Sequence, residues 1–251
     1  MPKKKIAFLG SKKIGLQCLK HLIEKGPELG CEIVCVLSNN RILESSCNET
    51  LTSLASLSGI PFLDDLDELL ELDDIDLIIS VQYHRILSEK HLLKAKEMSV
   101  NLHMAPLPEY RGCNQFSFAI LNQEEEFGTT LHEMRNGIDD GPILAQRRFK
   151  IPDNCFVDEL YNLTFNESIA LFKESVPSLV SGKLAPVEQD QINAIRREIH
   201  YRSEIDEIKK IEACWSTEKI IRHIRATAMP SFPPPFMKVG NKKINFSVED
   251  A

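Results

Sequence analysis

The sequence lacks the features of membrane proteins and of disulfide-stabilised proteins. None of its apolar runs is long enough to cross a bilayer, and the first, Ile6 to Leu9, has the length of a strand rather than of a signal peptide. The seven cysteines are odd in number and irregularly spaced, so no disulfide framework is expected. This cysteine usage indicates a reducing, cytoplasmic location. Cys31 and Cys35 have no second Cys or His pair at zinc-site spacing, so no metal is expected.

The sequence also lacks an excess of positive charge. Its 30 Lys and Arg residues against 37 Asp and Glu give a net charge of −7, and no basic stripe is evident. Proteins that grip nucleic acid usually carry such a stripe. The balance therefore counts against a tRNA substrate, while a nucleotide, which needs only a few local cations, stays compatible with it.

The N-terminal residues predict a strand, a turn, a helix and a second strand. Ile6 to Leu9 is followed by Gly10 and then by apolar residues at helical spacing, and Ile33 to Leu37 is the next buried strand. Gly26-Pro27 is the predicted end of the helix. A chain of 251 residues with 43% hydrophobic content can build one large α/β domain, with or without a small appendage. The N-terminal unit of strand, turn, helix and strand indicates a parallel sheet.

The turn between Gly10 and Gly15 gives little support for a nicotinamide site. Its Gly-x-x-x-x-Gly pattern is neither the dinucleotide fingerprint nor a P-loop. A tight turn beneath a helix is the simpler interpretation. A phosphate or sugar group near Ser11 and Lys12, at the helix N-terminus, is the functional alternative.

The rest of the chain predicts more strands, a long helix and a smaller terminal region. Ser216 is a predicted helix cap, and Gly240-Asn241 is the predicted tip of a hairpin. The further strands and the long helix are expected at Leu77 to Val81, Val100 to His103, Thr129 to Met134, Ile143 to Phe149 and Asp158 to Val180.

Asn101 and His103 are the first candidates for chemistry. Residues i and i+2 on a strand point to the same face, roughly 6–7 Å apart, so the amide and the imidazole share one small volume. A carboxylate has to come from elsewhere, and the Asp139-Asp140-Gly141 turn offers two. These residues predict a hydrogen-bond donor, an acid/base group and an orienting anion arranged around one reacting carbonyl. The alternative is that Asn101 caps a turn, His103 is an ordinary hydrogen-bonded histidine, and Asp139 forms an Asx turn.

Three motifs in this order resemble the formyltransferases that use 10-formyltetrahydrofolate. The family pattern is Asn-x-His, then Leu-Pro-x-Tyr-x-Gly, then Asp-x-Gly, found here at 101–103, 107–112 and 139–141. The resemblance covers about the first 185 residues well. It implies a Rossmann-like α/β fold with a mostly parallel twisted sheet, and a small C-terminal α/β extension.

The resemblance also implies roles for these residues. Asn101 and a protonated His103 would stabilise the oxyanion of a tetrahedral adduct, and Asp139 would orient the imidazole and accept a proton from the attacking amine. Asp140 occupies the variable place and is expected to be exposed, and the Leu107–Pro108 bond is expected to be cis. His132 aligns with a frequent family histidine, but we expect an ordinary hydrogen-bonded strand histidine there.

The loop after Val81 is the expected folate site. It lies at the carboxyl end of a parallel strand, where open α/β sheets bind ligands. In the family the equivalent loop contacts the pterin, and the matching residues here are Gln82, Tyr83 and Ile86, with Asp139 also facing the cofactor. His84 and Arg85 are expected to face water.

The motif loop and the C-terminal segment resemble most closely the enzymes that formylate dTDP-linked amino sugars. Aromatic side chains there can stack on a base and arginines can contact a pyrophosphate. The expected acceptor-contacting residues are Ser11, Lys12, Tyr110, Asn114, Gln115, Tyr201, Trp215, Arg225 and Phe232.

The sequence therefore predicts a sugar N-formyltransferase for surface polysaccharide synthesis, such as O-antigen, with 10-formyltetrahydrofolate as co-substrate. Residues 1–185 are expected to form the catalytic domain and residues 186–251 a small region completing the acceptor site. Other acceptors are methionyl-tRNA, then glycinamide ribonucleotide. The alternative of another class is a non-catalytic folate- or nucleotide-binding protein, followed by a nicotinamide oxidoreductase. No nucleic acid or membrane partner is expected, and the oligomer is left open, with a homodimer as one expectation.

Overall fold

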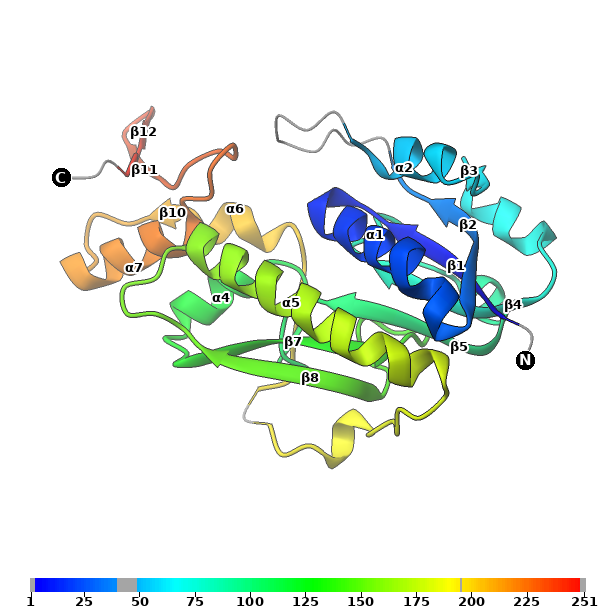
Figure 1. Cartoon of the computed structure of the whole chain (residues 1–251). Helices are drawn as coiled ribbons and strands as arrows, with labels where there is room; N and C mark the ends of the chain where they lie inside the picture. Colours follow the sequence, from blue (N-terminus) through cyan, green and yellow to red (C-terminus); the bar gives the residue numbers. More distant parts are fainter. Residues whose placement is uncertain (1–2, 40–48, 195, 249–251) are drawn as a thin grey trace.

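A twisted seven-stranded sheet forms the centre of the chain. The computed structural model describes residues 3–39, 49–194 and 196–248. The strand order is β3-β2-β1-β4-β5-β7-β8 (Figure 1). The strands are β1 Lys4–Gly10, β2 Cys31–Leu37, β3 Phe62–Leu63, β4 Ile75–Val81, β5 Ala95–His103, β7 Glu126–Glu133 and β8 Ile143–Lys150. The first five pair in parallel and the last two add antiparallel. The predicted mostly parallel α/β fold is confirmed.

The two sheet faces are covered by different elements because the strand residues alternate between them. On β1, Ile6 and Phe8 join the core under α1, α2 and α5, whereas Ala7 and Leu9 join the core under η1 and α3. Figure 1 shows α1 and α5 lying across the same face. The helices of this part are α1 Lys12–Leu29, α2 Leu51–Leu57, η1 Leu66–Glu71 (a 3₁₀ helix), α3 Glu89–Leu92, α4 Gln115–Leu121 and α5 Val157–Val180.

Helix α1 runs past its predicted end. Gly26-Pro27 was expected to stop it, but the helix continues to Leu29 and closes at Gly30, whose φ of 75° is left-handed. Pro27 lies in the last turn, so the N–H that it lacks costs only one intrahelical bond. Gly30 supplies the left-handed C-terminal residue with which many helices end.

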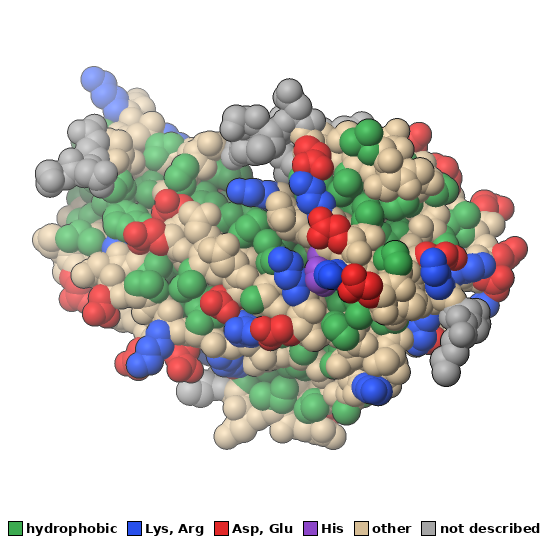
Figure 2. Space-filling model, in the orientation of Figure 1, with side chains coloured by type: hydrophobic (Ala, Val, Ile, Leu, Met, Phe, Trp, Pro, Cys, Tyr) green, Lys and Arg blue, Asp and Glu red, His purple; other side chains and the backbone are tan. Residues whose placement is uncertain are grey.

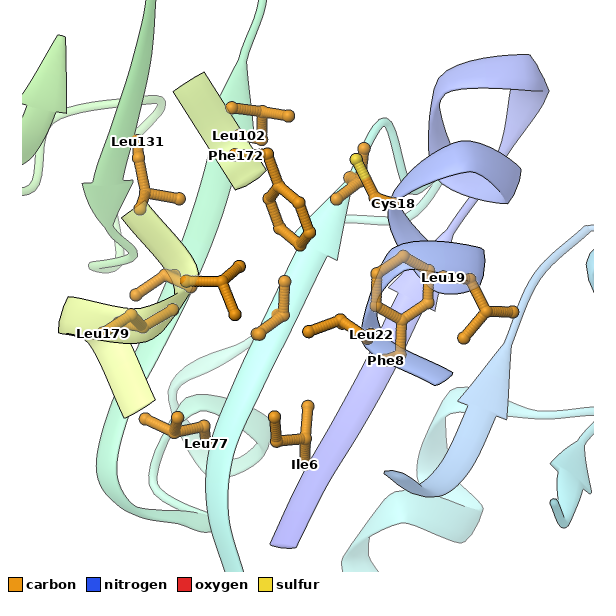
Figure 3. Close-up of a cluster of buried hydrophobic side chains, with 14 of the residues drawn as sticks. Ile6, Phe8, Cys18, Leu19, Leu22, Leu77, Leu102, Leu131, Phe172 and Leu179 are labelled. Carbon is orange, nitrogen blue, oxygen red and sulfur yellow. The ribbon is translucent and has the colours of Figure 1, made fainter. Parts of the chain in front are cut away.

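Phe172 of α5 lies at the centre of the largest core. Its side chain has no exposed area and points from α5 toward the sheet, between Leu102 of β5 and Leu22 of α1 (Figure 3). This packing ties the long helix to both the parallel and the antiparallel parts of the sheet.

The chain after α5 forms a smaller region on one side of the sheet. Strand β9 pairs in parallel with β6 (Tyr110–Gly112), and β10, β11 and β12 form a separate three-stranded sheet. The Ser216 cap and the hairpin at Gly240-Asn241 are as predicted. No helix among the described residues is long and apolar enough to cross a membrane. The elements of this region are η2 Gln189–Gln191, β9 Glu198–His200, α6 Glu204–Ile208, β10 Lys210–Ile211, α7 Thr217–Thr227, β11 Phe236–Val239 and β12 Lys242–Asn245.

We predict that Phe172→Ala lowers the free energy of unfolding by about 3–5 kcal/mol, because it removes a fully buried ring and leaves a cavity. Urea unfolding followed by circular dichroism measures the change. The control is Leu57→Ala, since Leu57 is 83% exposed, and it should shift stability by no more than about 0.5 kcal/mol. Equal effects of the two substitutions would contradict the assigned core.

Candidate active site

Strand register brings the candidate residues to one edge of the sheet. Gly10 of β1 pairs with Val81 of β4, and Val81 pairs in turn with Leu102 of β5. The polar residues that follow these strands therefore lie side by side. Antiparallel pairing then sets His132 of β7 opposite Asn101.

The carboxylate of Asp139 lies between two imidazoles. His103 Nδ1 is 3.6 Å from Asp139 Oδ2, and His132 Nε2 is 3.5 Å from Asp139 Oδ1. The two histidine side chains are 5% and 2% exposed and that of Asp139 is 17% exposed. The expected meeting of imidazole and carboxylate in space is found, with a second imidazole added to it.

The backbone of the Asp-x-Gly turn is shaped to place this carboxylate. Asp139 has a left-handed φ of 47°, and its Oδ2 accepts a hydrogen bond from the Gly112 N–H at 2.9 Å. A Cβ at Gly141 would lie 2.0 Å from the Glu133 carbonyl oxygen, so only glycine fits. Asp140 is half-buried, with Oδ1 enclosed, rather than exposed as predicted.

Backbone carbonyls determine which nitrogen of each imidazole carries a proton. His103 Nε2 lies 2.7 Å from the Tyr110 carbonyl oxygen and His132 Nδ1 lies 2.8 Å from that of Glu133. A carbonyl can only accept, so both of these nitrogens are donors. The other nitrogen of each ring faces Asp139, and a proton added there brings a positive charge beside the carboxylate.

His132 is a site residue that sequence reasoning underrated. It is a hydrogen-bonded strand histidine, as expected, but its partners are the other site residues. Its Nε2 lies 3.2 Å from Asn101 Nδ2 and faces Asp139. The available signal was the alternation of Thr130, His132 and Met134 on one strand face. The cross-strand pairing that makes it meaningful is not readable from sequence.

The imidazoles keep Asp139 ionised. Burial by itself raises the pKa of its carboxyl group, but the neighbouring His103 and His132 rings and the Gly112 N–H favour the carboxylate. The net result holds the pKa of Asp139 well below its usual range. The site thus combines a stable anion with amide and imidazole donors.

Two candidates assigned to different ligands, Lys12 and Gln82, touch each other at the carboxyl ends of β1 and β4. Lys12 Nζ donates to Gln82 Oε1 at 3.1 Å, and both residues have positive φ angles. The Ser11 N–H donates to the Val81 carbonyl, and its buried hydroxyl donates to Asn39 Oδ1 at 2.9 Å. Lys12 and Gln82 are therefore joined at this edge of the sheet, whereas Ser11 is 3% exposed and is enclosed rather than available to the acceptor as predicted.

The predicted folate loop presents two apolar side chains differently. Tyr83 is half-buried against the core under η1, and burial raises its pKa. Ile86 is 84% exposed. Arg85, expected to face water, pairs with Asp65 at 3.0 Å while staying largely exposed.

Tyr110 and Gln115 are corrections to the predicted acceptor contacts, because both side chains are enclosed. Tyr110 is 2% exposed, donates its hydroxyl to Glu124 Oε1 at 2.8 Å and accepts from Asn122. Gln115 is 8% exposed. The apolar neighbours of α4 and β7 enclose the phenol ring, and the contribution of Tyr110 to the site is its carbonyl oxygen.

Asn114 and Tyr201 are brought together by the pairing of β6 with β9. Asn114 Nδ2 donates to the Tyr201 carbonyl oxygen at 2.8 Å, and the Cys113 N–H donates to that of His200 at 2.8 Å. Tyr201 leaves its ring 56% exposed. The C-terminal region is thus joined directly to the motif loop.

Trp215 is packed within the chain, whereas Arg225 lines a cavity away from the catalytic centre. The Trp215 ring packs on His223 at 4.4 Å between centroids, with Lys219 Nζ at 4.1 Å from its centre. Arg225 donates to the Cys155 carbonyl at 3.3 Å and lines a cavity of about 490 Å³ together with Lys150. The residue that pairs with His132 lies at one end of β8, and Lys150 lies at the other end. Arg225, which is beside Lys150, is therefore not at the catalytic centre.

Phe232 differs from those two residues. Its ring is 59% exposed and lines a second cavity of about 480 Å³, shared with Phe156, Phe246 and Val248. Unlike the Trp215 ring, the Phe232 ring therefore stays accessible for stacking on a base.

Taken together, the sheet and the site define an α/β protein suited to acyl chemistry. Amide and imidazole donors converge where an oxyanion can form, and a carboxylate lies beside them to take a proton. Residues 4–175 match the family model for formyl transferase, and the chain belongs to this family.

Similar proteins carry related activities. The chain is 32% identical over 169 residues to GDP-perosamine N-formyltransferase of Brucella melitensis, an alignment covering 67% of this chain and 63% of that protein. It is similar in structure to an N-formyltransferase from Helicobacter canadensis in complex with folinic acid and dTDP-3-aminofucose (26% identity, TM-score 0.78, covering 97% of this chain and 86% of the other). It is also similar to a sugar 3N-formyl transferase studied with dTDP and 5-N-formyl-THF (25% identity, TM-score 0.79, 97% and 85%).

We predict that the stability advantage of the wild type over Asp139→Asn is pH-dependent. Because the folded-state pKa of Asp139 is lowered, its contribution is fully present above the unfolded value and is lost as the pH falls through the folded value. Urea unfolding of both proteins should give a difference in stability that shrinks as the pH falls below about 4. A difference unchanged down to acid pH would contradict the ionised, paired carboxylate.

Proposed function

We propose that this protein transfers the formyl group of 10-formyltetrahydrofolate to the amino group of a nucleotide-linked amino-deoxy sugar. The observation that carries the proposal is the cluster of Asn101, His103, His132 and Asp139 in a formyl transferase family member. No covalent enzyme intermediate is needed, since the acceptor amine is itself the nucleophile.

Asn101 and His103 are the proposed oxyanion donors. Attack of the amine on the formyl carbon forms a C–N bond and places negative charge on the formyl oxygen. When His132 Nε2 is unprotonated, Asn101 directs one N–H toward it at 3.2 Å, which leaves the second N–H of Asn101 for that oxygen. His103, held through Nε2 by the Tyr110 carbonyl, faces Asp139 with Nδ1, and when protonated it shares that N–H between the carboxylate and the formyl oxygen. Such preorganised donors are worth several kcal/mol in barrier height.

Asp139 is the proposed proton acceptor. Attack leaves the nitrogen positively charged, and a carboxylate that stays ionised can take its proton directly or through water. Collapse of the adduct breaks the bond to N10 of the folate, and the proton passes to that leaving nitrogen. The side chain's 17% exposure keeps it reachable from the site, while the two imidazoles hold it in place.

A nucleotide sugar is favoured as the acceptor over a nucleic acid. Basic and acidic side chains are interspersed on the face shown in Figure 2, without a basic stripe for a phosphate backbone. The relatives include a GDP-sugar enzyme and a structure with a dTDP-sugar, so either nucleotide fits the proposal. Methionyl-tRNA is the second candidate acceptor, since a methionyl-tRNA formyltransferase of Levilactobacillus brevis is 35% identical over 116 residues.

The region after residue 185 is proposed to complete the acceptor site. It adds β9 to the motif strand β6 and places the exposed rings of Tyr201 and Phe232 outside the catalytic half. Folate is proposed to occupy the surface near Gln82, Tyr83 and Ile86. Lys12, which touches Gln82, would then lie where donor and acceptor meet.

We predict formyl transfer to nucleotide-linked amino sugars in a screen with labelled formyl donor, comparing dTDP-3-amino, dTDP-4-amino and GDP-4-amino sugars with methionyl-tRNA.

Asn101→Ala should lower kcat by about 10²–10³ because it removes an oxyanion donor. Asn162→Ala is the matched control on the exposed face of α5. Labelling of the tRNA alone, or full activity of Asn101→Ala, would overturn the proposal.

We further predict that Phe232→Ala raises KM for the nucleotide acceptor about tenfold, because base stacking on an aromatic ring contributes roughly 1–3 kcal/mol. KM for the folate donor should not change. Val239→Ala, at a 54% exposed position in the same terminal region, is the control. An unchanged acceptor KM, with both proteins equally stable, would remove Phe232 from the acceptor site.

A further inference from the structure

Gln189 is a buried amide that lies outside the residues matched to the family. It begins η2, is 3% exposed, and follows the matched segment that ends at residue 175. No motif in the sequence marks it. Its side chain nevertheless contacts the loop that carries the catalytic carboxylate.

Every hydrogen-bonding capacity of this amide is used. Its Nε2 donates to the carbonyl oxygens of Asp139 and Gly141, each at 2.8 Å. Its Oε1 accepts from Arg111, at 3.0 Å from Nη2 and 3.3 Å from Nε. Carbonyls only accept and a guanidinium only donates, so the orientation of the amide is unambiguous.

These bonds join the two backbone segments that hold the Asp139 side chain. One segment is the Asp139 turn itself, in which the residue has the left-handed φ of 47° that is uncommon for non-glycine residues. The other is β6, where Arg111 precedes Gly112, the donor to Asp139 Oδ2, and follows Tyr110, the acceptor for His103. A single side chain therefore couples the position of the carboxylate to that of the imidazole.

We propose that Gln189 is a positioning residue for the Asp139–His103 pair, through which the C-terminal region takes part in catalysis without touching substrate. This inference rests on the proposed formyl transfer. An error of about 1 Å at a reacting group costs about 10²-fold in rate, so loss of the amide should act on kcat. KM for either substrate should change little.

Gln189→Glu is the sharpest test because it is isosteric. The carboxylate keeps the pairing with Arg111 but loses both N–H donors, so the carbonyls of Asp139 and Gly141 face an oxygen. Gln191→Glu introduces the same charge two residues away, at an exposed position of η2, and serves as control. Gln189→Asn, which keeps the amide but shortens it, covers the case in which the glutamate variant does not fold.

We expect kcat to fall about 10- to 100-fold in folded Gln189 variants, with both KM values within about twofold and Gln191→Glu like the wild type. The second readout is the imidazole ¹H–¹³C NMR signals at one fixed pH, assigned with His103→Asn and His132→Asn. The signals of His103 and His132 should move in the Gln189 variants, while that of the distant His21 on α1 should not.

The two readouts separate the possible failures. Unmoved imidazole signals together with wild-type kcat in a folded Gln189 variant would overturn the positioning role and leave formyl transfer standing. Moved signals in a protein that formylates no acceptor would support the positioning role and overturn the proposed function. A lower melting temperature alone, with unmoved signals and unchanged kcat, would reduce Gln189 to a structural residue.

Discussion

A carboxylate held between two imidazoles, with little solvent around it, must be oriented and stabilised from several directions at once. At Asp139 these contacts come from distant parts of the chain. His103 is carried by β5 and His132 by β7, the Gly112 N–H belongs to β6, and Gln189 holds the main chain of the turn from the C-terminal region. Burial raises the pKa of Asp139, but the two imidazoles and the Gly112 N–H outweigh it, so the pKa lies well below its usual range.

The antiparallel end of the sheet adds two of the site's side chains to those at the ends of the parallel strands. Parallel strands β1, β4 and β5 bring Ser11, Gln82 and Asn101 to one edge, as in other open α/β sheets. Strand β7 then runs back along β5 and sets His132 opposite Asn101. The turn into β8 returns Asp139 to the same place, so one hairpin contributes both the second imidazole and the anion.

Several aromatic and basic side chains that were predicted to contact the acceptor have partners within the protein instead. The phenol of Tyr110, the indole of Trp215 and the guanidinium of Arg225 each find partners within the chain. A large side chain contributes more free energy of folding when it packs against a neighbouring element than when it stays exposed at a ligand site. Composition near a site is therefore a weak guide to ligand contact, and exposure in the folded chain separates Phe232 from the others.

The sequence alone determined the α/β class, six of the seven strands of the central sheet, the pair Asn101 and His103 on one strand face, and the glycine-dependent turn after Asp139. These depend on period-two alternation and on backbone conformations that local residue types favour. Only the tertiary structure decided that His132 meets Asn101 and Asp139, that Tyr110 turns its ring inward, and that Gln189 grips the Asp139 turn. Those contacts follow from strand register and from a chain segment some fifty residues away, and no local preference encodes either.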